Sequence, residues 1–232
     1  MDIQEIIAFD KELLLALNGS DSLLADGFMW GITSTVAWIP MAIMLLYLII
    51  KNNSFTDVLL VIVFFALTIL IADQFSSSFC KPFFARYRPT HDPQIMYMVD
   101  VVRAYRGGNY GFISSHAANT FGVFVFLSLL IKDVRLSLSL LAWAVLCSYS
   151  RIYLGVHFPG DILCGAAFGS LAGLLCYAMY FVAKHRLVGC NVLISSQYTS
   201  SGYALSDVNA FLLMLNLTYV LLAVAAVFLG RS

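Results

Sequence analysis

The sequence predicts an all-α membrane protein, a polytopic bundle of six transmembrane helices preceded by a short amphipathic helix. Hydrophobic residues make up 61% of the 232 positions and charged residues only 11%, whereas soluble domains are roughly half apolar and a quarter charged. The apolar residues also fall into six stretches, each near the ~20 residues that a helix needs to cross a bilayer. The formal net charge is zero, which argues against a nucleic-acid partner.

The first segment, MDIQEIIAFDKELLLALNGSD, is expected to form a helix that lies on the membrane surface. It lacks the positive amino end and uninterrupted apolar core of a cleaved signal peptide. One flank of the helix is apolar and holds Ile3, Ile6, Ile7, Leu13, Leu14 and Leu17. The side chains expected to stay in water are Asp2, Glu5, Asp10, Lys11 and Glu12.

Each of the six apolar segments is expected to cross the membrane. They cover residues 25–50, 57–79, 115–131, 136–154, 161–184 and 208–230. The third is short and begins with polar residues, so we expect its first turns in a cavity and not in lipid. In the fifth, Gly165, Gly169 and Gly173 form a stripe that favours close helix packing. Without a linker or an internal repeat, residues 1–232 are expected to form a single domain.

Six crossings place both termini on one side of the membrane, together with the 80–114 loop and the 154–160 turn. The connections on the other side carry basic residues at the membrane edges, which is typical of the cytoplasmic face. These residues are Lys51, Lys132, Arg135, Lys184 and Arg186. We therefore expect the 80–114 loop on the outer face.

Three segments on that outer side combine basic residues, histidines, hydroxyls and a carboxylate. They read KPFFARYRP from residue 81, SSH from residue 114 and SRIYLGVHFPGD from residue 150. A single basic residue at a membrane edge usually snorkels or binds a lipid head group. The coincidence of three segments instead predicts a functional site. The candidate residues are Lys81, Arg88, Ser114, Ser115, His116, Arg151, His157 and Asp161.

The basic and hydroxyl residues suit the binding of a phosphoryl group. The guanidinium forks of Arg88 and Arg151 match pairs of phosphate oxygens, and Lys81 adds a third cation. Ser114 and Ser115 begin a helix, where free backbone N–H groups favour an anion. Together these groups describe a site for a tetrahedral oxyanion.

The histidines and the carboxylate suit the transfer of a phosphoryl group. Two histidines allow nucleophilic attack and protonation of the leaving group by separate side chains. Asp161 follows His157 by four residues, so it can accept a hydrogen bond from one imidazole nitrogen and leave the other nitrogen for attack. The five cysteines (Cys80, Cys147, Cys164, Cys176 and Cys190) lack metal-ligand spacing, and no metal site is predicted.

These motifs make the sequence resemble the type 2 phosphatidic acid phosphatases, a superfamily that includes the vanadium haloperoxidases. The family motif K-x6-R-P is matched from Lys81 to Pro89, and S-R-x5-H-x3-D from Ser150 to Asp161. The family motif P-S-G-H is degraded to ISSH, with Ile113 for proline and Ser115 for glycine. The motifs span residues 81–161, and the membrane branch of the family also has six helices.

The resemblance implies a role for each matched position. His157 would become a phosphohistidine, Asp161 would orient it, and His116 would protonate the departing oxygen and later activate water. The phosphoryl oxygens would be held by Lys81, Arg88, Ser114 and Arg151. These cations would act without a metal or other cofactor. Ser115 keeps the backbone N–H that the family glycine offers, so we expect the site to survive with an added hydroxyl contact.

The leading hypothesis is a membrane lipid phosphatase that hydrolyses a phosphomonoester or diphosphate head group through a phosphohistidine. Candidate substrates are polyprenyl diphosphates such as undecaprenyl diphosphate, phosphatidic acid, phosphatidylglycerol phosphate and the phosphates of lipid A. The alternative is a protein that binds or transports an anionic lipid without hydrolysis. The expected location is a bacterial inner membrane with the active site on the periplasmic face. The sequence leaves the lipid and the oligomeric state open.

Overall fold

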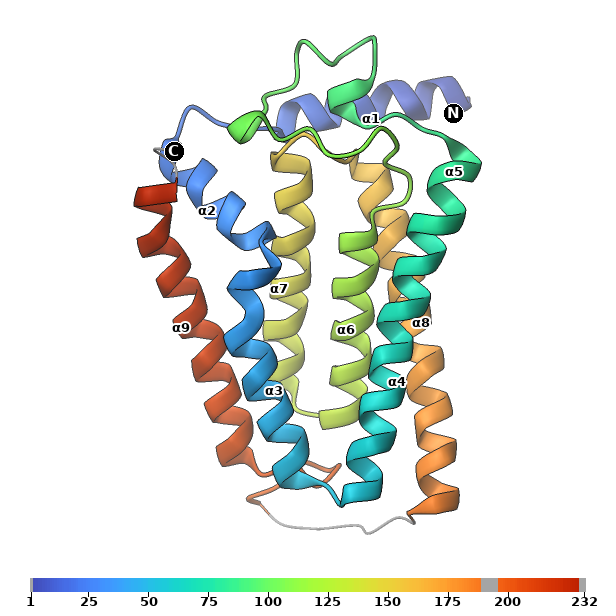
Figure 1. The fold of residues 1–232 in the computed structure, drawn as a ribbon, viewed down its shortest axis with the longest axis vertical. Helices are drawn as coiled ribbons and strands as arrows, with labels where there is room; N and C mark the ends of the chain where they lie inside the picture. Colours follow the sequence, from blue (N-terminus) through green and yellow to red (C-terminus); the bar gives the residue numbers. More distant parts are fainter. Residues whose placement is uncertain (1, 189–195, 230–232) are drawn as a thin grey trace.

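The computed structural model describes residues 2–188 and 196–229, and there the chain forms a bundle of long helices (Figure 1). Among these residues, five helical runs are long and apolar enough to cross a membrane, and the shorter apolar α6 stands between them. The helices are α1 (Ile3–Leu17), α2 (Leu23–Thr33), α3 (Ile39–Asn52), α4 (Phe55–Gln74), α5 (Lys81–Phe84), α6 (Ser115–Ile131), α7 (Val134–Tyr153), α8 (Pro159–Leu187) and α9 (Leu205–Leu229). The predicted polytopic helical bundle is therefore confirmed.

The first predicted span, residues 25–50, is not one helix. Helix α2 ends at Thr33, and α3 begins at Ile39 after a short 3₁₀ helix. Residues 33–35 read Thr-Ser-Thr, and β-branched and hydroxyl side chains are poor helix formers. Pro40 lies in the first turn of α3, where its missing N–H costs nothing, whereas it would break a continuous helix. The prediction of an uninterrupted first helix is therefore wrong.

The second span is longer than predicted. Helix α4 continues through a π-helical segment, Phe75–Cys80, directly into α5. The whole run covers residues 55–84, against the predicted 57–79. It ends at Ala85, whose left-handed backbone (φ 46°) turns the chain away. Because the helix extends this far, Lys81 lies on a helical turn at the end of the bundle where the 85–114 loop begins.

The connections gather at the two ends of the bundle (Figure 1). Helix α1, the 85–114 loop and the turn between α7 and α8 lie at one end, here called the loop end, and α1 runs across it. The α3–α4 and α6–α7 connections lie at the opposite end. The structure therefore places the predicted site segments at one end of the bundle. Near the opposite end, ion pairs join neighbouring helices: Lys51 Nζ to Asp207 Oδ1 (2.7 Å) and Lys184 Nζ to Asp57 Oδ2 (2.6 Å).

Helices α6 and α8 approach closely because α8 presents glycines to the backbone of α6. A Cβ atom added to Gly165, Gly169 or Gly173 would lie 2.5, 2.0 or 2.5 Å from the backbone oxygens of Ser114, Ala118 and Gly122. The tight packing predicted from the glycine stripe is therefore confirmed, and it occurs within one chain. It also fixes the start of α6 against the start of α8, where the candidate site lies.

We expect Gly169→Val to destabilise the bundle by about 3 kcal/mol, because the added side chain meets backbone that cannot move aside. The measurement is thermal unfolding of the purified protein in detergent. Gly108→Val is the matched control, since a Cβ at Gly108 has nothing within 4 Å. Equal melting temperatures for the two variants would contradict this account of the α6–α8 contact.

Candidate active site

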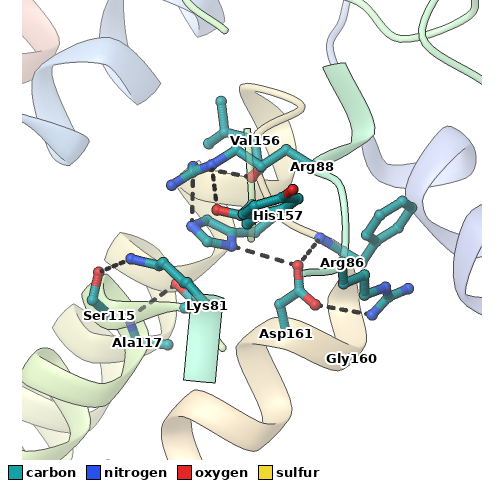
Figure 2. A network of polar contacts seen from close by, with 12 residues as sticks. Lys81, Arg86, Arg88, Ser115, Ala117, Val156, His157, Gly160 and Asp161 are labelled. Carbon is teal, nitrogen blue, oxygen red and sulfur yellow. Dashed lines mark hydrogen bonds and ion pairs between the residues drawn. The ribbon is translucent and has the colours of Figure 1, made fainter. Parts of the chain in front are cut away.

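All eight predicted site residues lie at the loop end, and five segments supply them. The segments are α5 (Lys81), the loop that follows it (Arg88), the start of α6 (Ser114, Ser115 and His116), the end of α7 (Arg151) and the α7–α8 turn with the start of α8 (His157 and Asp161). Figure 2 shows Arg88 and Asp161 on two sides of the His157 ring, with Lys81 and Ser115 nearby.

His157 lies at the centre of this cluster and is almost fully buried, at 1% exposure. Its Nε2 lies 3.3 Å from Nη1 of Arg88, and its Nδ1 lies 3.5 Å from Oδ2 of Asp161 (Figure 2). The turn that carries His157 requires Gly155, which has φ 67° and where a Cβ would lie 2.3 Å from Val99. This tight turn returns the chain to α8 at once, so His157 and Asp161 end side by side.

The neighbours of His157 define its protonation state. An arginine can only donate, so the Nε2 atom that faces Arg88 accepts and carries a lone pair. The proton then resides on Nδ1, which faces Asp161. Burial, followed by the charges of Arg88 and Arg151, lowers the pKa of His157 well below its ordinary value of 6.5. The imidazole is therefore neutral at pH 7. The 3.5 Å contact with Asp161 is long for a hydrogen bond, and catalytic contacts of this kind commonly shorten when substrate binds.

Asp161 is fully buried, and its two carboxylate oxygens and its backbone carbonyl each accept a hydrogen bond. Oδ2 accepts the backbone N–H of Phe158 (3.0 Å), and Oδ1 accepts Nη1 of Arg86 (2.9 Å). The backbone carbonyl of Asp161 accepts the N–H of Ser114 (3.0 Å), which ties the start of α8 to the start of α6. The carboxylate is therefore fixed in the position that faces His157.

Two arginines place positive charge near the imidazole. Arg88 donates Nε to the Tyr110 carbonyl (3.1 Å) and Nη1 to the Val156 carbonyl (3.2 Å), so backbone oxygens fix its fork. Arg151 is 3% exposed and donates Nη1 to the hydroxyl of Thr33 (2.6 Å). Its Nε has no hydrogen-bond partner among the described residues. A buried donor without a partner is costly, and beside two other cations it suits an anion.

Lys81 and the two serines form another side of the pocket. Nζ of Lys81 donates to the hydroxyl of Ser115 at 3.2 Å (Figure 2). It also donates to the hydroxyl of Ser77 at 3.2 Å. The Ser115 hydroxyl, predicted to add a contact, therefore binds Lys81 in this structure. The Ser114 hydroxyl caps α6 by accepting the N–H of Ala117 (3.4 Å). The O–H of Ser114 remains available as a donor at a helix start, which favours an anion.

His116 lies in the first turn of α6 and borders a cavity of about 220 Å³ between α2, α6 and α7. It is close enough to His157, Arg88, Arg151 and Lys81 for their charges to act on it. A second imidazole in this position can move protons for a group bound among the cations.

Sequence reasoning missed two charged residues, Arg86 and Asp10. Arg86 joins two carboxylates, with Nη2 at 2.7 Å from Oδ2 of Asp10 and Nη1 at 2.9 Å from Oδ1 of Asp161. Asp10 was predicted to face water but is only 8% exposed, and its Oδ1 also accepts the N–H of Gly160 (2.8 Å). That prediction is wrong because α1 packs on the start of α8. The signal for Arg86 was its place inside KPFFARYRP, two residues before Arg88.

The part of the chain that the structure describes contains no group of three or more His, Cys, Asp or Glu able to hold a metal ion. Of the cysteines, Cys190 lies outside the described residues. The candidate site combines fixed cations, a helix start and a neutral imidazole that presents a lone pair. Such a preorganised oxyanion pocket in a membrane bundle defines a membrane enzyme that acts on phosphate groups.

Known proteins place the chain in the same class. The model of the PAP2 superfamily matches residues 62–184. The chain is 38% identical over 189 residues to the lipid A 4′-phosphatase of Porphyromonas gingivalis. The matched region covers 82% of this chain and 80% of that protein. It is 41% identical over 186 residues to the lipid A 4′-phosphatase of Bacteroides thetaiotaomicron, which covers 80% of this chain and 81% of that protein.

Two crystal structures share the fold at lower identity. LpxE of Aquifex aeolicus has a TM-score of 0.55 and 24% identity over 72% of this chain and 93% of that chain. The PAP2-type phosphatidylglycerolphosphate phosphatase of Bacillus subtilis has a TM-score of 0.59 and 22% identity over 79% of this chain and 89% of that chain. The chain belongs to the PAP2 superfamily. It is an integral membrane lipid phosphatase, as the three motifs predicted.

Proposed function

We propose that the protein removes the 4′-phosphate of lipid A at the periplasmic face of a bacterial inner membrane. The observation that carries the reaction type is the buried imidazole of His157 between Arg88 and Asp161. The choice of lipid is supported by two relatives named lipid A 4′-phosphatase, each matched over at least 80% of both chains. Undecaprenyl diphosphate, phosphatidic acid and phosphatidylglycerol phosphate are the competing substrates.

In the first half-reaction the phosphate lies among the cations, and Nε2 of His157 attacks phosphorus. The bond from phosphorus to the lipid oxygen breaks, and His116 gives that oxygen its proton. Asp161 faces Nδ1 and stabilises the positive charge that the ring acquires. The oxygens of the transferring group are held by Lys81, Arg88, Ser114, Ser115 and Arg151.

In the second half-reaction water replaces the lipid. The water oxygen attacks the phosphohistidine, the bond from phosphorus to Nε2 of His157 breaks, and His116 takes a proton from the water. Inorganic phosphate then leaves. A protein that only binds or transports lipid has no need of this tautomer, in which Nδ1 of His157 faces Asp161 and Nε2 keeps its lone pair.

The distribution of basic residues between the two ends of the bundle supports the proposed membrane orientation. Lys51, Lys132, Arg135, Lys184 and Arg186 lie at or near the end opposite the site, and such an excess favours the cytoplasm. The loop end then faces the periplasm, at the level of the outer-leaflet head groups. Residues 1–232 act as one catalytic domain in this proposal.

The test is a lipid panel with the purified enzyme in mixed micelles. We expect phosphate release from lipid A that carries both the 1- and 4′-phosphates, with mass spectrometry locating the loss at the 4′ position. Lipid A that carries only the 1-phosphate is the matched control and should release none. Release confined to undecaprenyl diphosphate, phosphatidic acid or phosphatidylglycerol phosphate would refute the proposed substrate but keep the reaction type.

A further inference from the structure

The cavity beside His116 has a mostly apolar surface, but several polar side chains reach into its lining. Its volume of about 220 Å³ is many times the ~10–15 Å³ that a cavity needs in order to hold one water. It lies between the end of α2, α6 and α7. Its lining includes Thr33, Thr35, His116, Asn119, Thr120 and Trp143.

Two of the lining side chains bring polar atoms that the protein leaves unsatisfied. Nε1 of Trp143 and Oδ1 of Asn119 are buried and have no hydrogen-bond partner among the described residues. Trp143 is 6% exposed, so bulk solvent does not supply the partner. The indole N–H can only donate, whereas the amide oxygen accepts. Water both donates and accepts, and it is the usual partner of such buried groups.

The break between α2 and α3 also indicates that the cavity holds water. Residues between α2 and α3 leave the α-helical conformation, and irregular backbone at membrane depth occurs where it is buried in protein or lines a water-filled cavity. Thr33 and Thr35 from this break line the cavity. Because Thr33 also binds Nη1 of Arg151 at 2.6 Å, the cavity adjoins the phosphoryl pocket.

We propose that this cavity supplies the water that hydrolyses the phosphoenzyme, and that Asn119 and Trp143 hold that water for His116. The inference rests on the proposed function, because it assigns the source of the second substrate at the same site. Water from this side reaches His116 while the lipid product leaves through the head-group side. The water oxygen bonds to phosphorus, the bond to Nε2 of His157 breaks, and His116 accepts the proton.

Exchange of ¹⁸O between inorganic phosphate and water measures this half-reaction without any lipid. Phosphorylation of His157 by phosphate expels a water molecule, and its reversal takes one from the solvent. We expect the double variant Trp143→Phe with Asn119→Leu to exchange ¹⁸O-labelled phosphate about tenfold more slowly, because two hydrogen bonds to the water are lost. With lipid substrate, the first burst of dephosphorylated lipid keeps its wild-type rate, since that half-reaction consumes no water.

Trp38→Phe is the matched control, because Trp38 lines the same cavity as Trp143. The Nε1–H of Trp38 is already donated to the Ile32 carbonyl (2.9 Å), and its ring packs edge-on against Trp143, with 5.8 Å between ring centroids. This variant trims a neighbouring indole without removing an unpaired donor, so its exchange rate should stay within about twofold of wild type. If the double variant melts below the assay temperature, Trp143→Phe alone serves, with an expected slowing of about threefold.

The outcomes separate the two proposals. Wild-type exchange in a folded double variant would overturn the water site. A burst that slows together with exchange would also overturn it, since the cavity would then hold the leaving group. Wild-type enzyme that exchanges phosphate but releases none from lipid A would refute the proposed substrate and leave the water site standing.

Discussion

Replacing His157 by alanine is expected to abolish phosphate release, with kcat lowered by at least about 10⁴-fold. The reason is that Nε2 of His157 forms the bond to phosphorus in the proposed mechanism, with Arg88 facing this nitrogen and Asp161 facing Nδ1. The cations remain in the variant, so the lipid should still bind with a KM near that of wild type. The measurement combines initial rates of phosphate release with the amount of protein-bound phosphate after rapid mixing.

The control for this variant is His185→Ala. His185 belongs to the same helix, α8, but lies in its last turn at the opposite end of the bundle. Its replacement should leave both turnover and phosphoenzyme unchanged. If His157→Ala kept a tenth of the wild-type turnover, or still trapped phosphate on the protein, another residue would be the nucleophile. Loss of both signals with a preserved melting temperature would also exclude a role in binding or transport alone.

The features of the fold that depend on local pattern could be predicted from the sequence. The predicted span 115–131 coincides with α6, because its polar start and apolar continuation mark both ends. The predicted glycine stripe packs on α6, because a spacing of four residues keeps Gly165, Gly169 and Gly173 on one helix face. The site residues were predicted from motifs that the expected helix topology places on one side of the membrane. Segments on the same side of a helical bundle can meet there although they are far apart in the sequence.

Features that depend on contacts between distant segments could not be predicted. Asp10 and Glu12 both read as polar positions of a surface helix, yet only Asp10 packs against residues 76 and 150 positions away in the sequence. The break between α2 and α3 was hidden because Thr33 and Thr35 lie in an otherwise apolar run. Its importance depends on Arg151, 118 residues further along. Hydropathy measures the environment of each residue but carries no information about such partners.

Helix α1 fixes the segments that carry the site through several contacts with residues distant in the sequence. Nζ of Lys11 lies 2.7 Å from Oδ2 of Asp92, which ties the helix to the long loop. At its end, the side chain of Asn18 accepts the N–H of Asp100 (2.7 Å) and donates to the Tyr153 carbonyl (2.7 Å), just before the turn that carries His157. The contact nearest the chemistry is Asp10 with Arg86, because Arg86 also holds Asp161.

Arg86→Ala is therefore expected to lower kcat by about 10²-fold or more. The change leaves the carboxylates of Asp10 and Asp161 without their shared cation, and an unpaired buried charge costs about 3 kcal/mol. Asp161 then relaxes from its position beside His157, which weakens the nucleophile. Arg86→Lys should retain part of the rate, because an ammonium supplies the charge but cannot bridge two carboxylates with a planar fork.

The affinity for phosphate and the melting temperature distinguish a positioning role of Arg86 from a purely structural role. We expect the inhibition constant of inorganic phosphate to stay near its wild-type value in Arg86→Ala, because Arg86 does not border the phosphoryl pocket as Arg88 and Arg151 do. Arg106→Ala is the matched control, since Arg106 lies exposed in the same loop and binds the Thr90 carbonyl at 3.4 Å; its kcat should match wild type. If phosphate affinity fell as far as kcat, Arg86 would be holding substrate. If kcat stayed unchanged while the melting temperature fell, the bridge from α1 to Asp161 would serve the fold alone.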